Sequence, residues 1–596
     1  MIHFDLKKVF FAFLFLSLLT WYYFIGYGYS PTSDQASGIL IARDIARGNI
    51  LLHNWSLSTV SFYFTDLIWY AILSLIGVSN KVQSALMPAI LLSSLACASV
   101  YLIVSKKNAP WAILFTFVPV GIFSSQIFNL AVSHIGAYLY TAIVYVILEK
   151  DELKPRIYLK IITAFLCVAI FFSDDISKYS FLIPIALSTS ISYFNRREIN
   201  HAKQLLIILL SYALAKILFL SVVYFGGLSL PGVGSPKLAT IPQFLNNLTY
   251  ITIGSLDIFE ANFFGKEIGI LSISNIARFL FLIFFYIYLL VSLRKIKDYS
   301  TVDSALLLSS VIMPLAFIFS NIPSAVESIR YIAPSLIFGS IFICRNLWLS
   351  KRHSSYLVVI GLFTGFAISA NAMKTDRHNH EIDELTKFVK DNGLKKGFAS
   401  FWFASSVSLN SDSVISPVVF NESEGSVKPF LWLSKIENYE GKNDFIIADN
   451  QSDRESALKT FGNPTREYRI GSKIIMTWKN GVNLSFSGFH VKTNKYYFGS
   501  TGAGYDDKVC PGGDEPFMVT GPYKPLKKGE YNVKILMDGD GPISGDVVSN
   551  AGNKTLATFE NVKLFSFNVD KTYPDVEVRI YNKKENGCVK EISVSH

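Results

Sequence analysis

The sequence predicts two parts: an all-α body embedded in a membrane, and a soluble part made of an α/β module and a β-sandwich. First, 51% of the 596 residues are hydrophobic and only 17% are charged, which is too apolar for a soluble protein of this length. Second, nearly all long apolar runs lie before residue 375, and the remainder has ordinary soluble composition with many turn signals. Third, helical spacing in the soluble part gives way after about residue 480 to alternating, strand-like runs.

The helical body, residues 1–374, is predicted to cross the membrane about eleven times. Apolar runs of roughly 20 residues are long enough to span a bilayer as helices. The run at 63–77 is short and Asp66 interrupts its start, so we interpret it as a surface helix of the first loop. The predicted spans lie at about 8–28, 82–104, 110–127, 129–148, 158–173, 179–194, 203–225, 273–293, 303–321, 331–349 and 355–373.

The net charge of +10 does not indicate a nucleic-acid-binding protein. Much of the Lys and Arg sits in short clusters between apolar segments, which is the pattern of topology signals rather than of a binding face. A cytoplasmic N-terminus puts these clusters in the inner loops and turns the soluble part outward. The clusters are Lys7–Lys8, Lys106–Lys107, Lys150 with Lys154 and Arg156, Arg196–Arg197, Arg294 with Lys295 and Lys297, and Lys351–Arg352.

Three outer loops have features beyond those of a simple connection between two spans. They are residues 29–81, 226–272 and the short stretch 321–331. In the second, residues 241–259 are predicted to form an amphipathic surface helix.

The soluble part is predicted to contain two folds. Residues 375–483 form the α/β module, with a helix at 380–392 and strand-like runs at 397–403, 445–448 and 474–478. Residues 484–596 form an antiparallel β-sandwich, because alternating runs such as 530–536 and 576–581 are separated by turn residues. Cys510 and Cys588 can pair there if the compartment is oxidising, whereas Cys97, Cys167 and Cys344 lie in apolar segments and are interpreted as core residues.

The first loop holds the main catalytic candidate. Asp34 lies about six residues past the first apolar segment, at the predicted membrane boundary. Residues 36–47 are predicted to form a short amphipathic helix that Ser33 caps and that Gly48–Asn49 ends. A carboxylate beside a helix on the membrane surface suits chemistry on a lipid-linked substrate. The alternative is that Asp34 is a solvated loop residue.

Further polar residues mark the same membrane face. Asp174 and Asp175 follow the fifth span, with Lys178 close behind, and a paired carboxylate can bind a divalent cation or hold a general base. The alternative is a solvated helix end. His134 stands at the start of the fourth span, where a hydrogen-bonded structural histidine is the alternative.

Two cationic positions suit a phosphate. Arg330, between Glu327 and Tyr331 at the start of the tenth span, can hold a phosphate with its planar fork, and the alternative is an interfacial anchor. Lys216 lies in the middle of the seventh span, where a lone ammonium costs at least roughly 2.5 kcal/mol. We interpret it as the most costly residue of the membrane part. Its partner is either an anionic lipid headgroup or a carboxylate on another helix.

Motifs of nucleotide-dependent and of common hydrolytic enzymes are missing from the sequence. It has no Walker-type glycine-rich loop, no His-Glu-x-x-His, and no Gly-x-Ser-x-Gly with a plausible triad. An energy-rich substrate would therefore arrive already activated, on a lipid.

The early Asp34, the surface helices of the first loop, the eleven spans and Arg330-Tyr331-Ile-Ala-Pro334 together resemble the GT-C glycosyltransferases, such as the protein O-mannosyltransferases. The strings 48–55, 65–67 and Ser173-Asp174 resemble a bacterial branch with a C-terminal periplasmic domain. The resemblance implies an inner-membrane enzyme that moves a sugar from a polyprenyl-phosphate carrier to a cell-envelope glycan such as O-antigen.

That resemblance also implies roles. Asp34 would be the catalytic base, and Arg330, helped by Lys178 or Lys216, would neutralise the departing phosphate. Dependence on Mg²⁺ or Mn²⁺ is left open, because such enzymes often have an acidic residue in the outer loop that here spans 128–134, and this stretch has no carboxylate. Asp174 or Asp175 could fill that role. The remaining candidates for substrate binding are Asp44, His134, Asp174, Asp175, Glu327 and Tyr331.

The terminal β-sandwich resembles a carbohydrate-binding module. Aromatic residues of the soluble part can stack on sugar rings, with core packing as the alternative for each: Trp402, Trp432, Trp478 and Tyr496–Phe498. The rival functions are a transporter or flippase of lipid-linked saccharides, which predicts internal repeats that the sequence lacks, and a polysaccharide polymerase or ligase.

Overall fold

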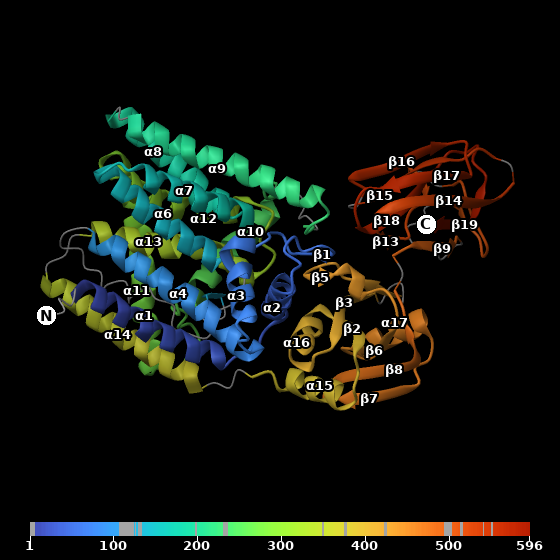
Figure 1. Ribbon diagram of the computed structural model, residues 1–596, viewed down its shortest axis with the longest axis horizontal. Coiled ribbons are helices and arrows are strands. Elements are labelled where there is room, and N and C mark those ends of the chain that lie inside the picture. The colour runs from blue at the N-terminus through green and yellow to red at the C-terminus, as the bar shows by residue number, and fades with distance from the viewer. Residues whose placement is uncertain are drawn as a thin grey trace. The chain divides into compact units, whose positions relative to one another are not determined.

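The computed structural model describes residues 6–105, 124, 127–128, 134–196, 199–230, 237–347, 351–374, 378–421, 426–484, 486–493, 503–512, 516–539, 541–549 and 552–596. The chain divides into two compact units, Met1–Asn379 and His380–His596. Figure 1 shows that the first is helical and the second is rich in β-strands. The predicted fold class, an all-α membrane domain followed by a soluble α/β and β part, is confirmed.

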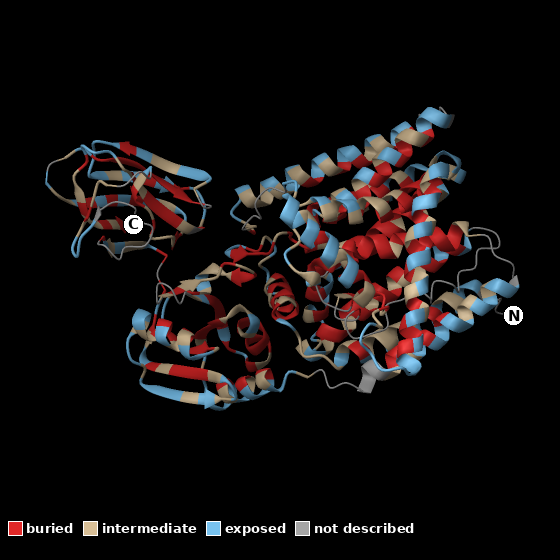
Figure 2. Ribbon diagram, turned by 180° about the vertical axis from the view of Figure 1, so that it is seen from behind, coloured by how far each residue is buried: buried red, intermediate tan, exposed pale blue. Residues whose placement is uncertain are grey.

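The first unit is a bundle of long apolar helices. Figure 2 shows residues buried on their inner sides and exposed on their outer sides. On α9, for example, Leu206, Leu210 and Leu220 are exposed, as expected of a helix that faces lipid. The helices are α1 (Leu6–Tyr27), α4 (Asn80–Val104), α6 (Ile135–Leu153), α7 (Ile157–Ser173), α8 (Ile183–Arg196), α9 (Ile199–Tyr224), α11 (Ile270–Ser292), α12 (Thr301–Phe319), α13 (Ala333–Asn346) and α14 (Lys351–Lys374).

Seven of the predicted spans coincide with helices long and apolar enough to cross a membrane: Lys7–Tyr27, Asn80–Val104, Asn200–Tyr224, Ile270–Asp298, Thr301–Phe319, Val326–Asn346 and Arg352–Ala370. Three more coincide with α6, α7 and α8, which are shorter or more polar. The predicted span at 110–127 lies almost entirely outside the described residues.

The first loop folds differently in detail from the prediction. Its first helix, α2, runs from Ser33 to Ala46, and Thr32 rather than Ser33 caps it, in a capping box with Gln35. Asp34 is therefore in the first helical turn. Most of α2 is buried, so it is not a surface helix. The turn that ends it uses Gly48 at a φ of 103°, which favours glycine.

The run at 63–77 forms the short helices η1 (Tyr63–Leu67) and α3 (Ile68–Leu75). Five and eight residues are too few to cross a bilayer. One face, with Trp69 and Ile72, is exposed, but Asp66 and Tyr70 are buried. The expectation of a surface helix is therefore wrong for the face that carries Asp66.

Backbone hydrogen bonds join the three outer loops. Leu228 and Ser229 of the second loop donate to the carbonyls of Leu51 and Trp55 in the first, at 2.8 and 2.9 Å. Ala239 donates to Phe319 at 2.8 Å, just before the third loop. The predicted helix at 241–259 is present as α10 (Ile241–Ile258). The loops thus form one connected layer at one end of the bundle.

The opposite end of the bundle contains a buried ionic network that the sequence did not reveal. Arg345 of α13 bonds Asp303 of α12 at 2.6 Å and Glu149 of α6 at 2.8 Å, and it also donates to the Leu102 carbonyl of α4. Burial strengthens such bonds and makes the loss of one partner costly. The network therefore ties four helices together.

The first sheet of the second unit has the order β4-β3-β2-β6-β8-β7. Helices α15 and α16 supply side chains to the core on one face, and α17 to the core on the other. The predicted strand at 397–403 ends at Ser400, and Phe401 begins α16. The elements are α15 (His380–Asp391), β2 (Lys396–Ser400), α16 (Phe401–Ser411), β3 (Val414–Asn421), β4 (Ser426–Pro429), β6 (Asn443–Ala448), α17 (Gln451–Phe461), β7 (Arg466–Ile470) and β8 (Lys473–Val482).

The last 110 or so residues form two antiparallel sheets around one apolar core. One contains β10, β11, β19, β14, β17 and β9, and the other β12, β18, β15, β16 and β13. The strands are β9 (Gly488–Lys492), β10 (Ala503–Gly504), β11 (Val509–Cys510), β12 (Phe517–Val519), β13 (Lys524–Leu526), β14 (Gly529–Asp538), β15 (Ser544–Ser549), β16 (Lys554–Glu560), β17 (Leu564–Val569), β18 (Tyr573–Tyr581) and β19 (Cys588–Ser595).

The aromatic candidates of this unit have different surroundings. Trp478 is 8% exposed in a core, so the packing alternative holds for it. Trp402 is 64% exposed on α16 and stacks edge-on with Phe401. Trp432 is half-buried, and Tyr496–Phe498 lie outside the described residues.

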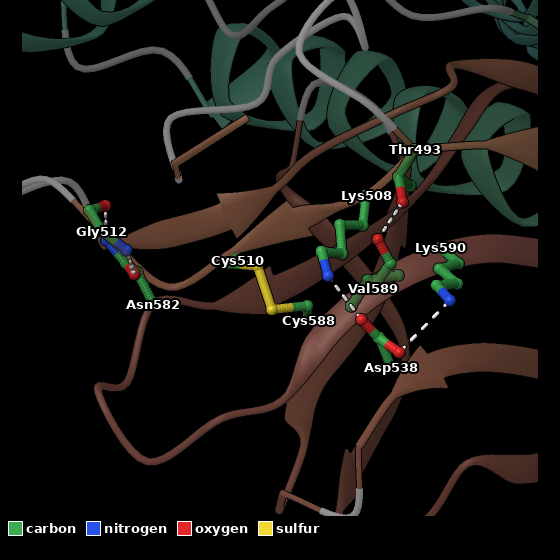
Figure 3. The surroundings of a disulfide bond; sticks show 9 residues. All are labelled: Thr493, Lys508, Cys510, Gly512, Asp538, Asn582, Cys588, Val589 and Lys590. Carbon is green, nitrogen blue, oxygen red and sulfur yellow. Dashed lines mark hydrogen bonds and ion pairs between the residues drawn. A yellow bond between two sulfur atoms is a disulfide. The ribbon is translucent and has the colours of Figure 1, made fainter. Parts of the chain in front are cut away.

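A disulfide joins Cys510 of β11 to Cys588 of β19, so the two cysteines that the sequence left open do pair (Figure 3). Beside it, Lys508 and Lys590 both bind the Asp538 carboxylate. The bridge joins residues 78 apart in the chain. In the chain-entropy description, a cross-link over a loop of this length restricts the unfolded chain strongly.

We therefore expect the double variant Cys510→Ala, Cys588→Ala to lower the unfolding free energy of this unit by about 4 kcal/mol. Pulse proteolysis of the full chain in increasing urea would measure the midpoint. Reducing agent should shift the wild-type midpoint to that of the variant and leave the variant unchanged. Equal midpoints for oxidised wild type and variant would show that the bridge does not stabilise the fold.

Candidate functional site

The chain brings four of the predicted residues to one end of the helical bundle. Asp34 follows α1, His134 precedes α6, Asp174 follows α7 and Arg330 precedes α13. The other ends of these helices carry the basic clusters of the sequence, such as Lys154 with Arg156 between α6 and α7. The polar candidates therefore share the end of the bundle where the three outer loops meet.

Asp34 combines partial exposure with a desolvated carboxyl group. It lies in the first turn of α2 and makes no hydrogen bond to any described residue. Burial raises the pKa of this carboxyl, and the positive charge of Arg330 opposes the shift. The two side chains thus lie within electrostatic range of each other. A carboxylate with a raised pKa and free oxygens is suited to accept a proton.

Arg330 is held at the end of the short helix η5 (Val326–Ile332). Helix α10 lies against η5 so closely that a Cβ at Gly254 would be 2.6 Å from Ile329. The Arg330 guanidinium lies 5.4 Å from the ring centre of Tyr331 and is itself exposed. Its donors are therefore free to bind an anion while the backbone beneath them is fixed by packing.

His134 and Asp174 form a buried pair. The His134 Nδ1 lies 2.6 Å from an Asp174 carboxylate oxygen, and the side chains are 13% and 0% exposed. Asp174 also accepts the backbone N–H of Ile176 at 3.1 Å. His134 has a φ of 70°, a left-handed conformation that is uncommon for a residue with a side chain. The sequence named both residues separately but did not predict their contact.

Asp66 is the main residue that sequence reasoning missed. It is 1% exposed, and no hydrogen bond of good geometry reaches its carboxyl oxygens from the described residues, although the Thr65 hydroxyl and the Gly136 N–H lie near enough to favour the charged form. The hydroxyls of Tyr70 and Tyr138 are also buried and unpartnered within the described part of the chain. Gly136 allows η1 to approach α6, since a Cβ there would lie 2.1 Å from the Thr65 carbonyl oxygen. The only signal in the sequence was a carboxylate inside an apolar run.

Burial raises the pKa of the Asp66 carboxyl to about 7, and the Asp174 carboxylate acts in the same direction. The native protein thus binds a proton that the unfolded chain releases near its ordinary value of about 3.9. A raised native pKa stabilises the fold at low pH, and this stabilisation is lost as the pH rises through about 7.

We expect detergent-solubilised wild type to lose about 3 kcal/mol of stability between pH 5 and pH 8 through this group. Asp66→Asn removes the titration, so its melting temperature should fall less over the same range. Thermal melts of both proteins at several pH values would test this. Identical pH dependence of wild type and variant would rule out Asp66 as the titrating group.

Asp175, the next residue after Asp174, pairs with two lysines rather than with His134. Its carboxylate binds Lys216 of α9 at 2.7 Å and Lys178 at 3.0 Å. Burial opposes the ionisation of Asp175, but the bonds and charges of the two lysines outweigh it and lower its pKa. The carboxylate alternative for Lys216 is therefore the one the structure contains. The interpretation of Lys216 as the most costly residue is wrong, because Arg278 of α11 is only 1% exposed.

Two further candidates lie away from this group. Asp44 accepts hydrogen bonds from Asn49 at 2.7 Å and from Trp55 at 2.8 Å, and so braces the end of α2. Glu327 is exposed in the first turn of η5. Within the described ranges, no three His, Cys, Asp or Glu side chains gather as a metal site. Dependence on Mg²⁺ or Mn²⁺ stays open, and titration of activity with a chelator tests it.

Comparison with known proteins finds similarity only among solved structures. No family model matches the chain, and no curated protein matches it. A structure of the arabinofuranosyltransferase AftD from Mycobacteria aligns with 98% of this chain at 9% identity and a TM-score of 0.34. The arabinosyltransferase EmbB from Mycobacterium smegmatis aligns with 98% at 12% identity and a TM-score of 0.27. This chain covers 58% and 64% of those two chains.

Proposed function

We propose that this protein is an inverting glycosyltransferase of the GT-C type that moves a sugar from a polyprenyl-phosphate carrier to a cell-envelope glycan. The observation that carries the proposal is that Asp34 lies within electrostatic range of Arg330 at one end of the helical bundle. A proton acceptor and a fixed cation are the two groups that a single displacement from a sugar phosphate needs.

The reaction is one displacement at the anomeric carbon. Asp34 takes the proton of an acceptor hydroxyl while that oxygen attacks the sugar. The bond to the carrier phosphate breaks, and Arg330 stabilises the negative charge that develops on the phosphate. Packing of α10 against η5 fixes the backbone that carries Arg330, which places a positive charge near the phosphate before the charge grows. A single displacement inverts the anomeric configuration.

Charge distribution supports a periplasmic location for this chemistry. The described basic clusters Lys7–Lys8, Lys154 with Arg156, and Arg294 with Lys295 lie at helix ends opposite to Asp34 and Arg330. The positive-inside rule places such clusters in the cytoplasm. The site then faces the periplasm of a bacterial inner membrane, with the donor lipid entering from the bilayer and the glycan acceptor from the aqueous side.

The proposal is tested with the full-length protein in lipid nanodiscs. Radiolabelled hexose and pentose donors on polyprenyl phosphate are supplied with envelope glycans as acceptors, and transfer is measured by product mobility and mass spectrometry. Transfer with inverted configuration is expected. Movement of the donor across the membrane without a new glycosidic bond would instead indicate a flippase. Transfer of a whole glycan chain would indicate a polymerase or ligase.

A further inference from the structure

The two ring nitrogens of His134 differ in their hydrogen bonding. Its Nδ1 faces the Asp174 carboxylate at 2.6 Å, whereas Nε2 makes no hydrogen bond to any described residue. Packing fixes the ring, since the Phe62 ring centre is 5.0 Å away and that of Tyr331 is 6.5 Å away. A carboxylate on Nδ1 holds that nitrogen protonated, so the chemistry of the residue takes place at Nε2.

Polar side chains from several loops surround His134. The charged and titratable groups around it come from four elements: Asp174 after α7, Asp66 in η1, Tyr138 in α6, and Arg330 with Tyr331 in η5. Asp174, whose carboxylate is fully buried, lies at hydrogen-bond distance from Nδ1 and fixes the orientation of the ring. Arg330 is exposed and is not bonded to the ring.

The ring also lies where the carrier phosphate is proposed to bind. The Tyr331 ring lies beside the His134 ring, and Tyr331 directly follows Arg330 in η5. The short helix η5 therefore brings the Arg330 guanidinium close to His134. Asp34, at the start of α2, is already available as the proton acceptor. A proton donor for the phosphate oxygen that leaves the sugar would add to the charge stabilisation that Arg330 supplies.

We propose that His134, held by Asp174, is the general acid that donates the Nε2 proton to the leaving phosphate oxygen. This inference rests on the proposed glycosyl transfer. The bond between the anomeric carbon and the phosphate oxygen breaks, its electron pair stays on that oxygen, and the His134 proton neutralises it. The acceptor proton goes to Asp34. His134, which is 13% exposed, is reprotonated from water after release of the carrier.

The discriminating variant is His134→Asn. Asparagine tolerates the left-handed backbone of this position, and its amide nitrogen can take the place of Nδ1 beside Asp174, but it has no counterpart of Nε2. A purely structural histidine would therefore be replaced well by asparagine. For a general acid we expect kcat to fall roughly 10²–10⁴-fold with little change in donor KM, while the melting temperature stays near that of wild type.

Asp174→Asn gives the second readout. It removes the carboxylate that orients the His134 ring, so kcat should fall roughly tenfold or more while the donor KM stays near that of wild type. Asp391→Asn, which removes an exposed carboxylate of α15, is the control and should leave kcat unchanged.

Near wild-type kcat in His134→Asn, or in Asp174→Asn, would overturn this inference while leaving the proposed transfer intact. If folded wild type transfers no sugar from any polyprenyl-phosphate donor, the proposed function fails, and this inference fails with it.

Discussion

We expect Asp34→Asn to lower kcat roughly 10²–10⁴-fold, because the amide cannot accept the proton of the acceptor hydroxyl. The change is nearly isosteric, and Asp34 makes no hydrogen bond to a described residue that the amide would break. The melting temperature should therefore stay close to that of wild type. The measurement is sugar transfer in nanodiscs, at donor concentrations well above KM.

The pH dependence of wild type gives an independent reading of the same group. The base must be ionised, so the rate falls as the pH drops through the pKa of Asp34. Burial raises this pKa above its ordinary value, and the acid limb should therefore lie above the range of an exposed aspartate. Asp391→Asn, at an exposed position of α15, is the matched control and should leave rate and profile unchanged. Wild-type turnover by Asp34→Asn would remove Asp34 as the base.

The parts of the fold that the sequence predicted are those with local signals. Apolar runs marked ten helices that the structure describes, and period-two alternation marked β14 and β18. The errors lie where packing against a neighbouring element, rather than local composition, determines the secondary structure. Phe401–Phe403 have strand-like composition, yet they begin α16, where Ala404 and Val407 reach the core.

The site was predictable as a set of residues but not as a set of contacts. Asp34, His134, Asp174 and Arg330 were visible because polar residues next to apolar runs stand out. Their pairing depends on how the loops fold back over the bundle, for which one sequence offers no signal. Asp66, Arg278 and Arg345 lie inside or at the edge of apolar runs, and only burial and charged neighbours distinguish them.

Arg330→Gln is expected to lower kcat roughly 10²–10³-fold, because the phosphate then leaves without a fixed positive charge beside it. Arg330→Lys keeps the charge but loses the planar fork, so its rate should lie between those of wild type and Arg330→Gln. The exposure of Arg330 and its position over the Tyr331 ring make misfolding an unlikely cause of the loss.

The same variant should also change the titration of Asp34. Arg330 lowers the pKa of that carboxyl, so removing its charge raises the pKa and moves the acid limb of the rate to higher pH. Arg330→Lys should leave the limb close to its wild-type position. Arg352→Gln is the matched control, since Arg352 also lies over a tyrosine ring, that of Tyr356 at 5.7 Å, but near the opposite end of the bundle. An unchanged acid limb in Arg330→Gln, with full activity, would show that Asp34 and Arg330 do not work in one site.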